Sequence, residues 1–237
     1  MNAPVIRKIR TRREYIPLSL VEFARLIDLG WINPRLPIDV STLWATQKFQ
    51  INPKILQYNF DLTEKGADSF PYPIDIEVQY ATQSAIAAVE KAGGRVRTAY
   101  YDVESLEAAV NPKAWFEKGR VVPRRKTPPA SLIEYYMDAK NRGYLCEETE
   151  IEKERQLSAD VRGYELTETL KITSALKSID QVFHGIPSGC VVSLADRKVF
   201  APKNETYQGN QEQQEKLMGH HRMLVQFWNS IFCEEIC

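Results

Sequence analysis

Alternating strand and helix patterns in the middle of this 237-residue chain restrict its fold more than any other feature. Apolar and polar residues alternate over 74–80, which is typical of a half-buried β-strand. The alanine-rich segment 84–92 is a predicted helix, because the glycine pair after it supplies a stop signal. A second strand is predicted over 96–101, and a short helix opened by an aspartate cap over 103–110. These elements predict a compact unit of the β-α-β-α type, and therefore an α/β fold.

Helix signals also occur before this unit. Ser19 and Glu22 form a capping box that opens a helix, and Gly30 supplies its left-handed end. A shorter helix is predicted over 40–46. Segment 47–73 contains several prolines and a glycine, and is predicted to be an irregular connection with one short strand.

After the unit, a basic loop that contains prolines is predicted over 113–129. A second capping box, Ser131 with Glu134, predicts a helix that runs to Arg142 and ends at Gly143. Further elements are predicted in this order along the chain: a charged, exposed helix over 147–162, a helical stretch within 166–183, and a two-stranded hairpin over 191–200.

The architecture expected from these elements is a compact core with an extended basic arm and additional peripheral helices. Its four predicted regions are a basic arm over 1–16, an N-terminal helix and irregular connector over 17–73, an α/β domain with helical insertions over 74–205, and an amphipathic C-terminal helix over 206–237. One face of the last helix carries apolar side chains and a histidine, namely Leu217, His221, Leu224, Val225, Trp228 and Ile231.

Composition excludes several classes of protein. Hydrophobic residues make up 43% of the chain, which is enough to fill a core and argues against wholesale disorder. No apolar run of about 18 residues predicts a membrane span, and the N-terminus lacks the apolar segment of a secretory signal. The four cysteines form no Cys-x-x-Cys pair, so neither a disulfide framework nor a thiolate zinc site is expected. A reducing compartment is the simpler interpretation.

Few residues fit a catalytic or cofactor site. The glycine pair 93–94 follows a helix, whereas phosphate-binding glycines precede one, and no P-loop motif occurs. Ser188 lacks the context of a nucleophile elbow, and Cys190 precedes a hydrophobic strand in which buried cysteine is ordinary packing. The histidines at 220–221 would point about 100° apart on a helix, which does not suit one metal ion. No metal, cofactor or enzymatic activity is expected, and a small hydrolase using Cys190 or Ser188 is kept as an alternative.

The 31 basic and 31 acidic side chains give no net charge, but the basic ones gather locally. The predicted arm carries Arg7, Lys8, Arg10, Arg12 and Arg13. The predicted loop carries Lys118, Arg120, Arg124, Arg125 and Lys126. Two smaller groups are Arg95 with Arg97 and Lys140 with Arg142. Guanidinium groups bind phosphate oxygens and stack on bases, so these residues are predicted to bind RNA. A protein-only adaptor that binds through the C-terminal helix is a second hypothesis.

Several stretches resemble one family of proteins. Residues 85–94, with the strand residues 76–78 before them, are similar to the signature of ribosomal protein fifteen of the large subunit. Stretches that resemble the mitochondrial branch of this family are Pro17-Leu18-Ser19-Leu20, Leu26-Ile27-Asp28-Leu29-Gly30, Pro37-Ile38-Asp39, Gly66-Ala67-Asp68, Pro123-Arg124-Arg125, residues 135–145, and Val191-Val192 with Ala195-Asp196. The resemblance covers about residues 15–43, 66–145 and 184–202.

This resemblance implies a non-enzymatic structural constituent of the large subunit of the mitochondrial ribosome, located in the mitochondrial matrix. Such a protein would bind and brace ribosomal RNA during assembly and translation. Neighbouring large-subunit proteins would cover part of its surface, and it would have no small-molecule substrate. Members of the family carry a long, basic, glycine-rich N-terminal extension, which this chain is expected to lack.

Overall fold

The centre of the molecule is built from parallel strands, in a computed structural model that describes residues 14–49, 57–166 and 177–201. One sheet has the order β1-β2-β4 and consists of β1 (Glu14–Ser19), β2 (Gln57–Thr63) and β4 (Tyr80–Ala81). A second parallel pair consists of β3 (Asp75–Val78) and β5 (Arg95–Thr98). The two sheets meet at Gln79, whose N–H donates to the Phe60 carbonyl at 3.2 Å.

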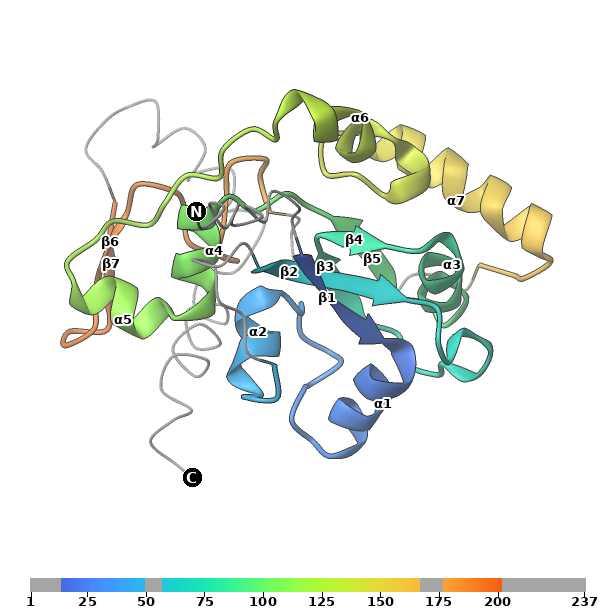
Figure 1. The fold of residues 1–237 in the computed structure, drawn as a ribbon, viewed down its shortest axis with the longest axis horizontal. Helices are drawn as coiled ribbons and strands as arrows, with labels where there is room; N and C mark the ends of the chain where they lie inside the picture. Colours follow the sequence, from blue (N-terminus) through green and yellow to red (C-terminus); the bar gives the residue numbers. More distant parts are fainter. Residues whose placement is uncertain (1–13, 50–56, 167–176, 202–237) are drawn as a thin grey trace, which may run out of the picture.

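Helices lie on both sides of these strands (Figure 1). One side is covered by α1 (Leu20–Asp28) and α2 (Val40–Ala45), and the opposite side by α6 (Ala130–Met137) and α7 (Glu148–Arg162). Between β4 and β5 the chain forms α3 (Gln83–Lys91). One end of the molecule is made by α4 (Val103–Val110), α5 (Pro112–Glu117) and the antiparallel hairpin of β6 (Val191–Ser193) and β7 (Lys198–Phe200). Two short 3-10 helices are η2 (Ala67–Ser69) and η3 (Ala139–Asn141).

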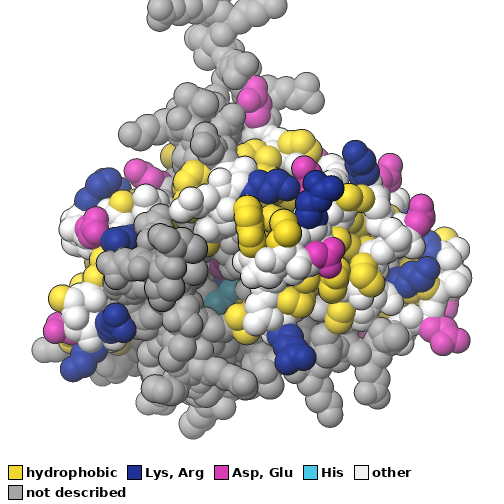
Figure 2. Space-filling view, turned by 90° about the horizontal axis from the view of Figure 1, so that it is seen from below, with side chains coloured by type: hydrophobic (Ala, Val, Ile, Leu, Met, Phe, Trp, Pro, Cys, Tyr) yellow, Lys and Arg dark blue, Asp and Glu magenta, His cyan; other side chains and the backbone are white. Residues whose placement is uncertain are grey.

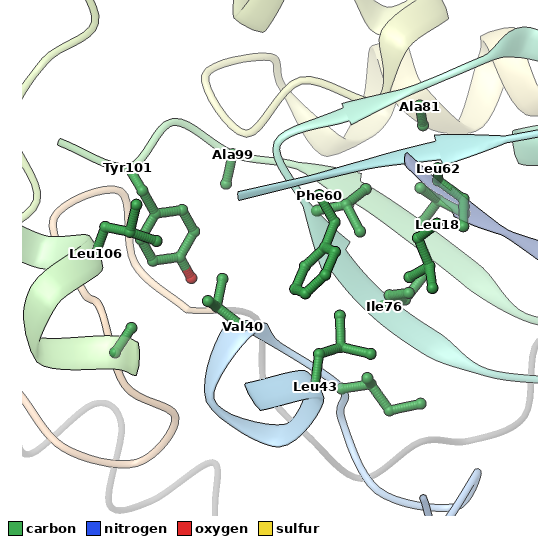
Figure 3. Close-up of a cluster of buried hydrophobic side chains, with 14 of the residues drawn as sticks. Leu18, Val40, Leu43, Phe60, Leu62, Ile76, Ala81, Ala99, Tyr101 and Leu106 are labelled. Carbon is green, nitrogen blue, oxygen red and sulfur yellow. The ribbon is translucent and has the colours of Figure 1, made fainter. Parts of the chain in front are cut away.

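A single cluster of buried apolar side chains runs from Leu18 to Val192. At its centre, side chains of three parallel strands meet the inner face of α2 (Figure 3), and they include Leu18, Phe60, Leu62, Ile76, Val40 and Leu43. Burial of one such side chain contributes about 1.5–3 kcal/mol. The segments on either side of residue 73 therefore share one core.

Several predicted elements are confirmed. The N–H of Glu22 donates to Ser19 Oγ at 3.3 Å where α1 begins, and Gly30 has a φ of +75° after it ends. The predicted helices over 40–46, 84–92, 103–110 and 147–162 are present as α2, α3, α4 and α7. The predicted hairpin is present as β6 and β7. The signals of these elements lie in their own residues, in caps and stop glycines, except that the aspartate cap predicted for α4 does not form, because the Asp102 side chain accepts no main-chain N–H of that helix.

The strand predicted over 74–80 is wrong in two respects. It ends at Val78, and residues 80–81 pair with β2 in the other sheet instead. It is also buried on both faces, because Asp75 and Glu77 are ion-paired inside the fold rather than exposed to water. Paired carboxylates can occupy positions that an alternating pattern assigns to solvent.

The loop predicted over 113–129 begins as a helix. Asn111 Oδ1 accepts the N–H of Ala114 at 3.0 Å, and Pro112 occupies the first turn of α5. Proline is well tolerated there, because that N–H has no partner inside a helix. The Asn-Pro pair that ends α4 therefore also starts α5.

The helix predicted over 131–142 ends early, since α6 stops at Met137, and its predicted capping box does not form. Asp138 then accepts the N–H of Lys140 at 2.9 Å and opens η3. Residues 142–144 join the edge of β5 through two main-chain bonds with Thr98, of 2.9 and 3.0 Å. Pairing with a strand therefore replaces the last turns of the predicted helix.

Some predictions fall partly or wholly outside the described residues. The predicted arm overlaps the described part of the chain only at residues 14–16, which open β1. Of the helical stretch predicted within 166–183, residues 177–183 form turns and a bridge. Residues 1–13 and the predicted helix over 206–237 lie outside the described residues.

Candidate RNA interface

Three cations of the loop predicted over 113–129 lie beside acidic residues of α4 and of the segment around residue 180. Three surface ion pairs connect them: Arg120–Glu107 at 3.7 Å, Arg124–Asp180 at 3.4 Å and Lys126–Glu104 at 2.9 Å. Roughly half to two-thirds of each of these three basic side chains remains exposed. Exposed pairs contribute only about 0–1 kcal/mol, so an RNA phosphate can replace the carboxylate. Lys118 is exposed and forms no ion pair within the described residues.

Arg125 does not share this surface, which corrects its predicted role. Its side chain is completely buried, and Nη2 lies 2.7 Å from Glu77 Oε1 in β3. The guanidinium group lies between two aromatic rings, 4.6 Å from the centre of Tyr101 and 5.2 Å from that of Tyr144. A buried charge is tolerated only when it is paired in this way. Arg125 therefore fastens the loop to the core and is not accessible to RNA.

Glu77 is the centre of a buried group of charges. It accepts hydrogen bonds from Arg125, from Lys177 Nζ at 3.3 Å and from the Tyr101 hydroxyl. Lys177 Nζ also donates to Asp39 at 3.0 Å, which joins the segment at residue 177 to the start of α2. Burial raises the pKa of Glu77, but Arg125 and Lys177 more than reverse this and hold the pKa well below its ordinary value. Glu77 therefore stays ionised inside the protein.

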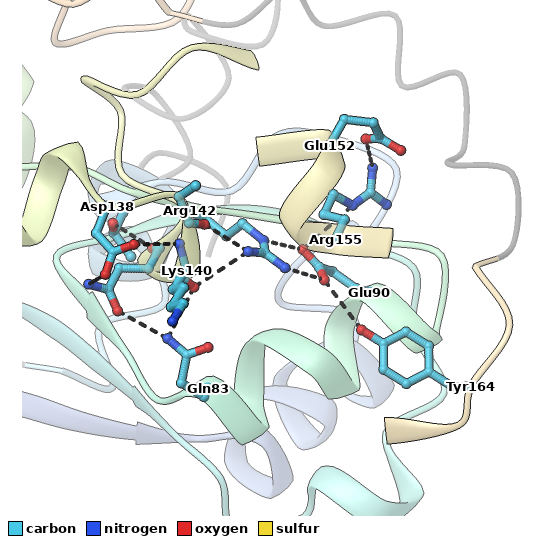
Figure 4. Close-up of polar contacts among 11 residues, drawn as sticks. Gln83, Glu90, Asp138, Lys140, Arg142, Glu152, Arg155 and Tyr164 are labelled. Carbon is cyan, nitrogen blue, oxygen red and sulfur yellow. Dashed lines mark hydrogen bonds and ion pairs between the residues drawn. The ribbon is translucent and has the colours of Figure 1, made fainter. Parts of the chain in front are cut away.

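A second buried group surrounds Glu90 of α3 (Figure 4). Arg142 donates to both oxygens of this carboxylate, at 2.7 and 2.9 Å, and to the Ala139 carbonyl at 2.7 Å. Arg155 of α7 lies 3.5 Å from the same carboxylate. The Arg142 side chain is only 2% exposed, so it joins η3 to α3 and is not accessible to RNA, contrary to its predicted role. The neighbouring Lys140 is exposed.

Arg95 and Arg97 alternate along β5 with buried residues, so both lie on one side of the strand, as predicted. Arg95 donates to both oxygens of Asp75 in the adjacent strand, at 3.1 and 2.6 Å. Arg97 Nη1 donates to the Lys177 carbonyl at 2.8 Å, and burial lowers the pKa of its guanidinium group. Both side chains are therefore engaged within the fold and only partly accessible.

The residues considered as nucleophiles are part of the packed interior. Cys190 is fully buried, and burial raises the pKa of its thiol to about 11. The Ser188 hydroxyl donates to the Asp180 carbonyl at 2.8 Å. Burial and the charge of Lys177 lower the pKa of His184 to about 4, and its Nδ1 has no hydrogen-bond partner within the described residues. The arrangement holds no activated nucleophile among the described residues.

Two further kinds of site are absent from the described part of the chain. That part contains no group of three or more His, Cys, Asp or Glu side chains that could hold a metal ion. None of its helices combines the length and the apolar character that a membrane crossing needs.

The fold also brings together cations that no run in the sequence marks. Arg25 of α1 and Lys65, which follows β2, line one groove of about 430 Å³ with Ser19 and Thr63. Neither cation forms an ion pair within the described residues. Seen from the side on which α1 lies, basic side chains are scattered among apolar and acidic ones rather than gathered in one patch (Figure 2). Because each of these cations stands alone in the sequence, only the tertiary structure shows that they are neighbours.

The other predicted group of cations lies outside the described residues: Arg7, Lys8, Arg10, Arg12 and Arg13. Their contact with RNA stays a prediction.

Comparisons with known proteins agree with the resemblance seen in the sequence. Residues 17–97 match the family of ribosomal proteins 50S-L15 and 50S-L18e and their 60S counterpart. Large ribosomal subunit protein uL15m of Danio rerio is 38% identical over 197 residues, which cover 81% of this chain and 67% of that protein. The uL15m protein of Neurospora crassa is 31% identical over 149 residues, or 54% of this chain and 47% of its own length. The uL15 protein of Acidiphilium cryptum is 33% identical over 97 residues, which cover 41% of this chain and 57% of that protein. The chain therefore belongs to this family of large-subunit ribosomal proteins, in its mitochondrial uL15m branch.

Proposed function

We propose that this protein is a structural constituent of the large subunit of the mitochondrial ribosome, where it binds and braces folded ribosomal RNA. The observation that carries the proposal is the similarity to uL15m, at 38% identity over 81% of the chain. The proposed role is non-enzymatic, which agrees with the burial of Cys190 and Ser188 in the core. Neighbouring large-subunit proteins are the second class of partner.

The position of each cation suggests how this role is divided. Buried cations such as Arg125, Arg142 and Lys177 pair with carboxylates and hold distant segments together. Three exposed cations of the loop can exchange a surface carboxylate for a phosphate, namely Arg120, Arg124 and Lys126. The fourth, Lys118, is exposed and has no carboxylate to exchange within the described residues. We propose that these four, with the arm, Lys140 and the partly exposed Arg95 and Arg97, form the RNA-facing surface.

The surface of α7 has the opposite character. Its first turns and the residue before them expose Glu147, Glu148, Glu150 and Glu152. Like charges disfavour contact with a phosphate backbone. We therefore propose that α7 faces solvent or a neighbouring protein.

Sedimentation of mitochondrial extracts tests the assignment to the ribosome. The protein is expected in the fractions of the large subunit, because its proposed role is to stay bound to folded RNA. A protein that remains at the top of the gradient would contradict the assignment.

Salt dependence of RNA binding tests the loop surface. Each phosphate contact contributes about 0.7–0.9 to the slope of log affinity against log salt. The double substitution Arg124→Ala/Lys126→Ala is therefore expected to reduce that slope by about 1.4–1.8 for large-subunit ribosomal RNA. The control Lys153→Ala/Arg162→Ala removes two exposed charges from α7 and is expected to leave the slope unchanged. An unchanged slope in the loop variant, or an equal loss in the control, would show that the loop does not contact RNA.

A further inference from the structure

One exposed face of α1 carries apolar and basic side chains together. Val21, Arg25 and Leu29 follow one another at intervals of four positions along this helix and its C-terminal cap, so their side chains lie in one row. Val21 is 43% exposed and Leu29 is 59% exposed, and Trp31, which follows the helix, is 55% exposed. Apolar side chains cover a broad part of this side of the molecule (Figure 2). We call Val21, Arg25, Leu29 and Trp31, together with Lys65, the α1 face.

The α1 face is held in place by close packing between two segments of the backbone. The N–H of Val21 donates to the Lys65 carbonyl at 3.1 Å. A Cβ atom at Gly66 would lie 2.5 Å from Val21 Cγ2, so the turn after β2 packs directly against the start of α1. The groove of about 430 Å³ lies along these two segments and is lined by Val21, Arg25 and Lys65. Its shape is therefore formed before any partner binds, which lowers the entropic cost of binding.

The acidic side chains of α1 have partners within the fold, whereas the two cations of the groove have none. The carboxylate of Glu22 accepts a hydrogen bond from a serine hydroxyl at 3.1 Å, and the carboxylate of Asp28 accepts one from a tyrosine hydroxyl. Arg25 and Lys65 are exposed and form no ion pair within the described residues. Two exposed carboxylates of the turn after β2 lie outside the groove, namely Glu64 and Asp68. The groove therefore offers two cations for which the described residues provide no carboxylate.

This combination of side chains fits a protein partner better than RNA. Tryptophan and arginine are enriched among the residues that dominate binding at protein interfaces. An RNA-binding face instead gathers Lys and Arg in one patch, and the basic side chains on this side are scattered among apolar ones (Figure 2). A second copy of this chain fits less well, because a two-fold contact would place Arg25 and Lys65 opposite the same cationic surface.

We infer that the α1 face binds an acidic, partly apolar segment of another protein. Apolar side chains of that segment cover Val21, Leu29 and Trp31, and its carboxylates pair with Arg25 and Lys65 in the groove. The inference rests on the proposed function and deepens it, because it assigns one surface to the neighbouring proteins of the large subunit. It adds no RNA contact to those proposed for the loop.

Photo-cross-linking in intact mitochondria tests this inference. Replacement of Trp31 with p-benzoylphenylalanine is expected to give an adduct with another protein, because the side chain at this position lies on the α1 face. The cross-linked peptide, identified by mass spectrometry, is expected to contain more acidic than basic residues. The same replacement at Arg124 is the control for the method and is expected to give an adduct with ribosomal RNA.

Charge reversal tests the role of the two cations. Arg25→Glu/Lys65→Glu is expected to lower the adduct yield at Trp31 by roughly 10-fold or more, because carboxylates then face carboxylates. Arg25→Gln/Lys65→Gln removes the same charges without adding negative ones, and a smaller loss of yield is expected. The matched control Lys153→Glu/Arg162→Glu reverses two exposed charges of α7 and is expected to leave the yield unchanged.

The results that would overturn the inference are distinct from those that contradict the proposed function. An adduct with RNA, with a second copy or within the same chain would overturn the inference, and so would a cross-linked peptide that is not acidic. A yield that loss of both cations leaves unchanged would do the same. Co-sedimentation with the large subunit without any adduct at Trp31 would overturn only this inference. An adduct with an acidic peptide, in a protein that stays at the top of the gradient, would contradict only the ribosomal assignment.

Discussion

Two adjacent arginines have different roles, although they have the same side chain and charge, because one is exposed and the other is buried. Arg124 keeps 67% of its side chain exposed, whereas Arg125 is fully buried against Glu77. The rings of Tyr101 and Tyr144 cover the guanidinium group of Arg125. Removal of Arg125 would break a buried ion pair and leave the Glu77 carboxylate with only Lys177 and the Tyr101 hydroxyl as partners, and breaking a buried pair is strongly destabilising.

Replacement of each arginine tests this difference. Arg125→Met is expected to lower the free energy of unfolding by about 3–5 kcal/mol, because it breaks a buried pair. Arg124→Met is the matched control and is expected to change it by less than about 1 kcal/mol. Urea denaturation followed by circular dichroism measures both values. Equal losses in the two variants would show that Arg125 does not hold the core together.

At the scale of elements, the turn after η3 decides where the chain leaves α6 and joins β5. A Cβ atom at Gly143 would lie 2.1 Å from the carbonyl oxygen of Tyr136, which is backbone and cannot rotate away. Glycine is therefore required at this position by close packing. Gly30 has a different role, because it has a φ of +75° after α1 and, apart from its neighbours in the chain, no atom of the described residues lies within 4 Å of the position of a Cβ.

Replacing each of these two glycines with alanine measures two costs separately, that of a steric clash at Gly143 and that of a left-handed backbone conformation at Gly30. Gly143→Ala is expected to destabilise the protein by about 3 kcal/mol, at the upper end of the cost of overpacking. Gly30→Ala should cost about 1–2 kcal/mol, because only the left-handed conformation is penalised. Thermal and urea denaturation of both variants give these values. A smaller loss at Gly143 than at Gly30 would mean that η3 can move away from α6 at little cost.

At the scale of the whole molecule, buried charges connect segments that are far apart in the sequence. Lys177 lies between Asp39 at the start of α2 and Glu77 in β3, and these contacts bring the segment that contains His184 onto the core. Burial and the charge of Lys177 lower the pKa of His184 to about 4, from an ordinary value of 6.5. The imidazole is therefore neutral in the folded protein at neutral pH.

This histidine makes folding sensitive to mild acid. Below pH 6.5 the unfolded chain binds a proton at His184 that the folded protein does not bind until about pH 4. The contribution of His184 to stability is therefore complete above pH 6.5 and is lost as the pH falls toward 4. His184→Asn is expected to flatten the decline of the free energy of unfolding across this range, measured by urea denaturation at several pH values.

The control for this prediction is His220→Asn, which changes a histidine of the C-terminal segment and should leave the decline unchanged. A decline as steep in His184→Asn as in the unmodified protein would show that other groups cause it.

The sequence by itself determined the family and most of the helices. The capping box at Ser19, the glycine at residue 30 and the alanine-rich segment 84–92 act over a few neighbouring positions, so local patterns were sufficient to predict α1 and α3. The motifs that resemble the ribosomal family are likewise contiguous, and the comparisons confirm that resemblance.

Only the tertiary structure decided which cations remain available to RNA. Arg125 and Arg142 stand among other basic residues in the sequence, yet each is buried against a glutamate about fifty positions away. Long-range ion pairs also bury both faces of β3, and main-chain pairing of residues 142–144 with Thr98 of β5 replaces the last turns of the predicted helix. Burial depends on partners that are distant in the chain, and no local pattern of hydrophobicity or charge contains that information.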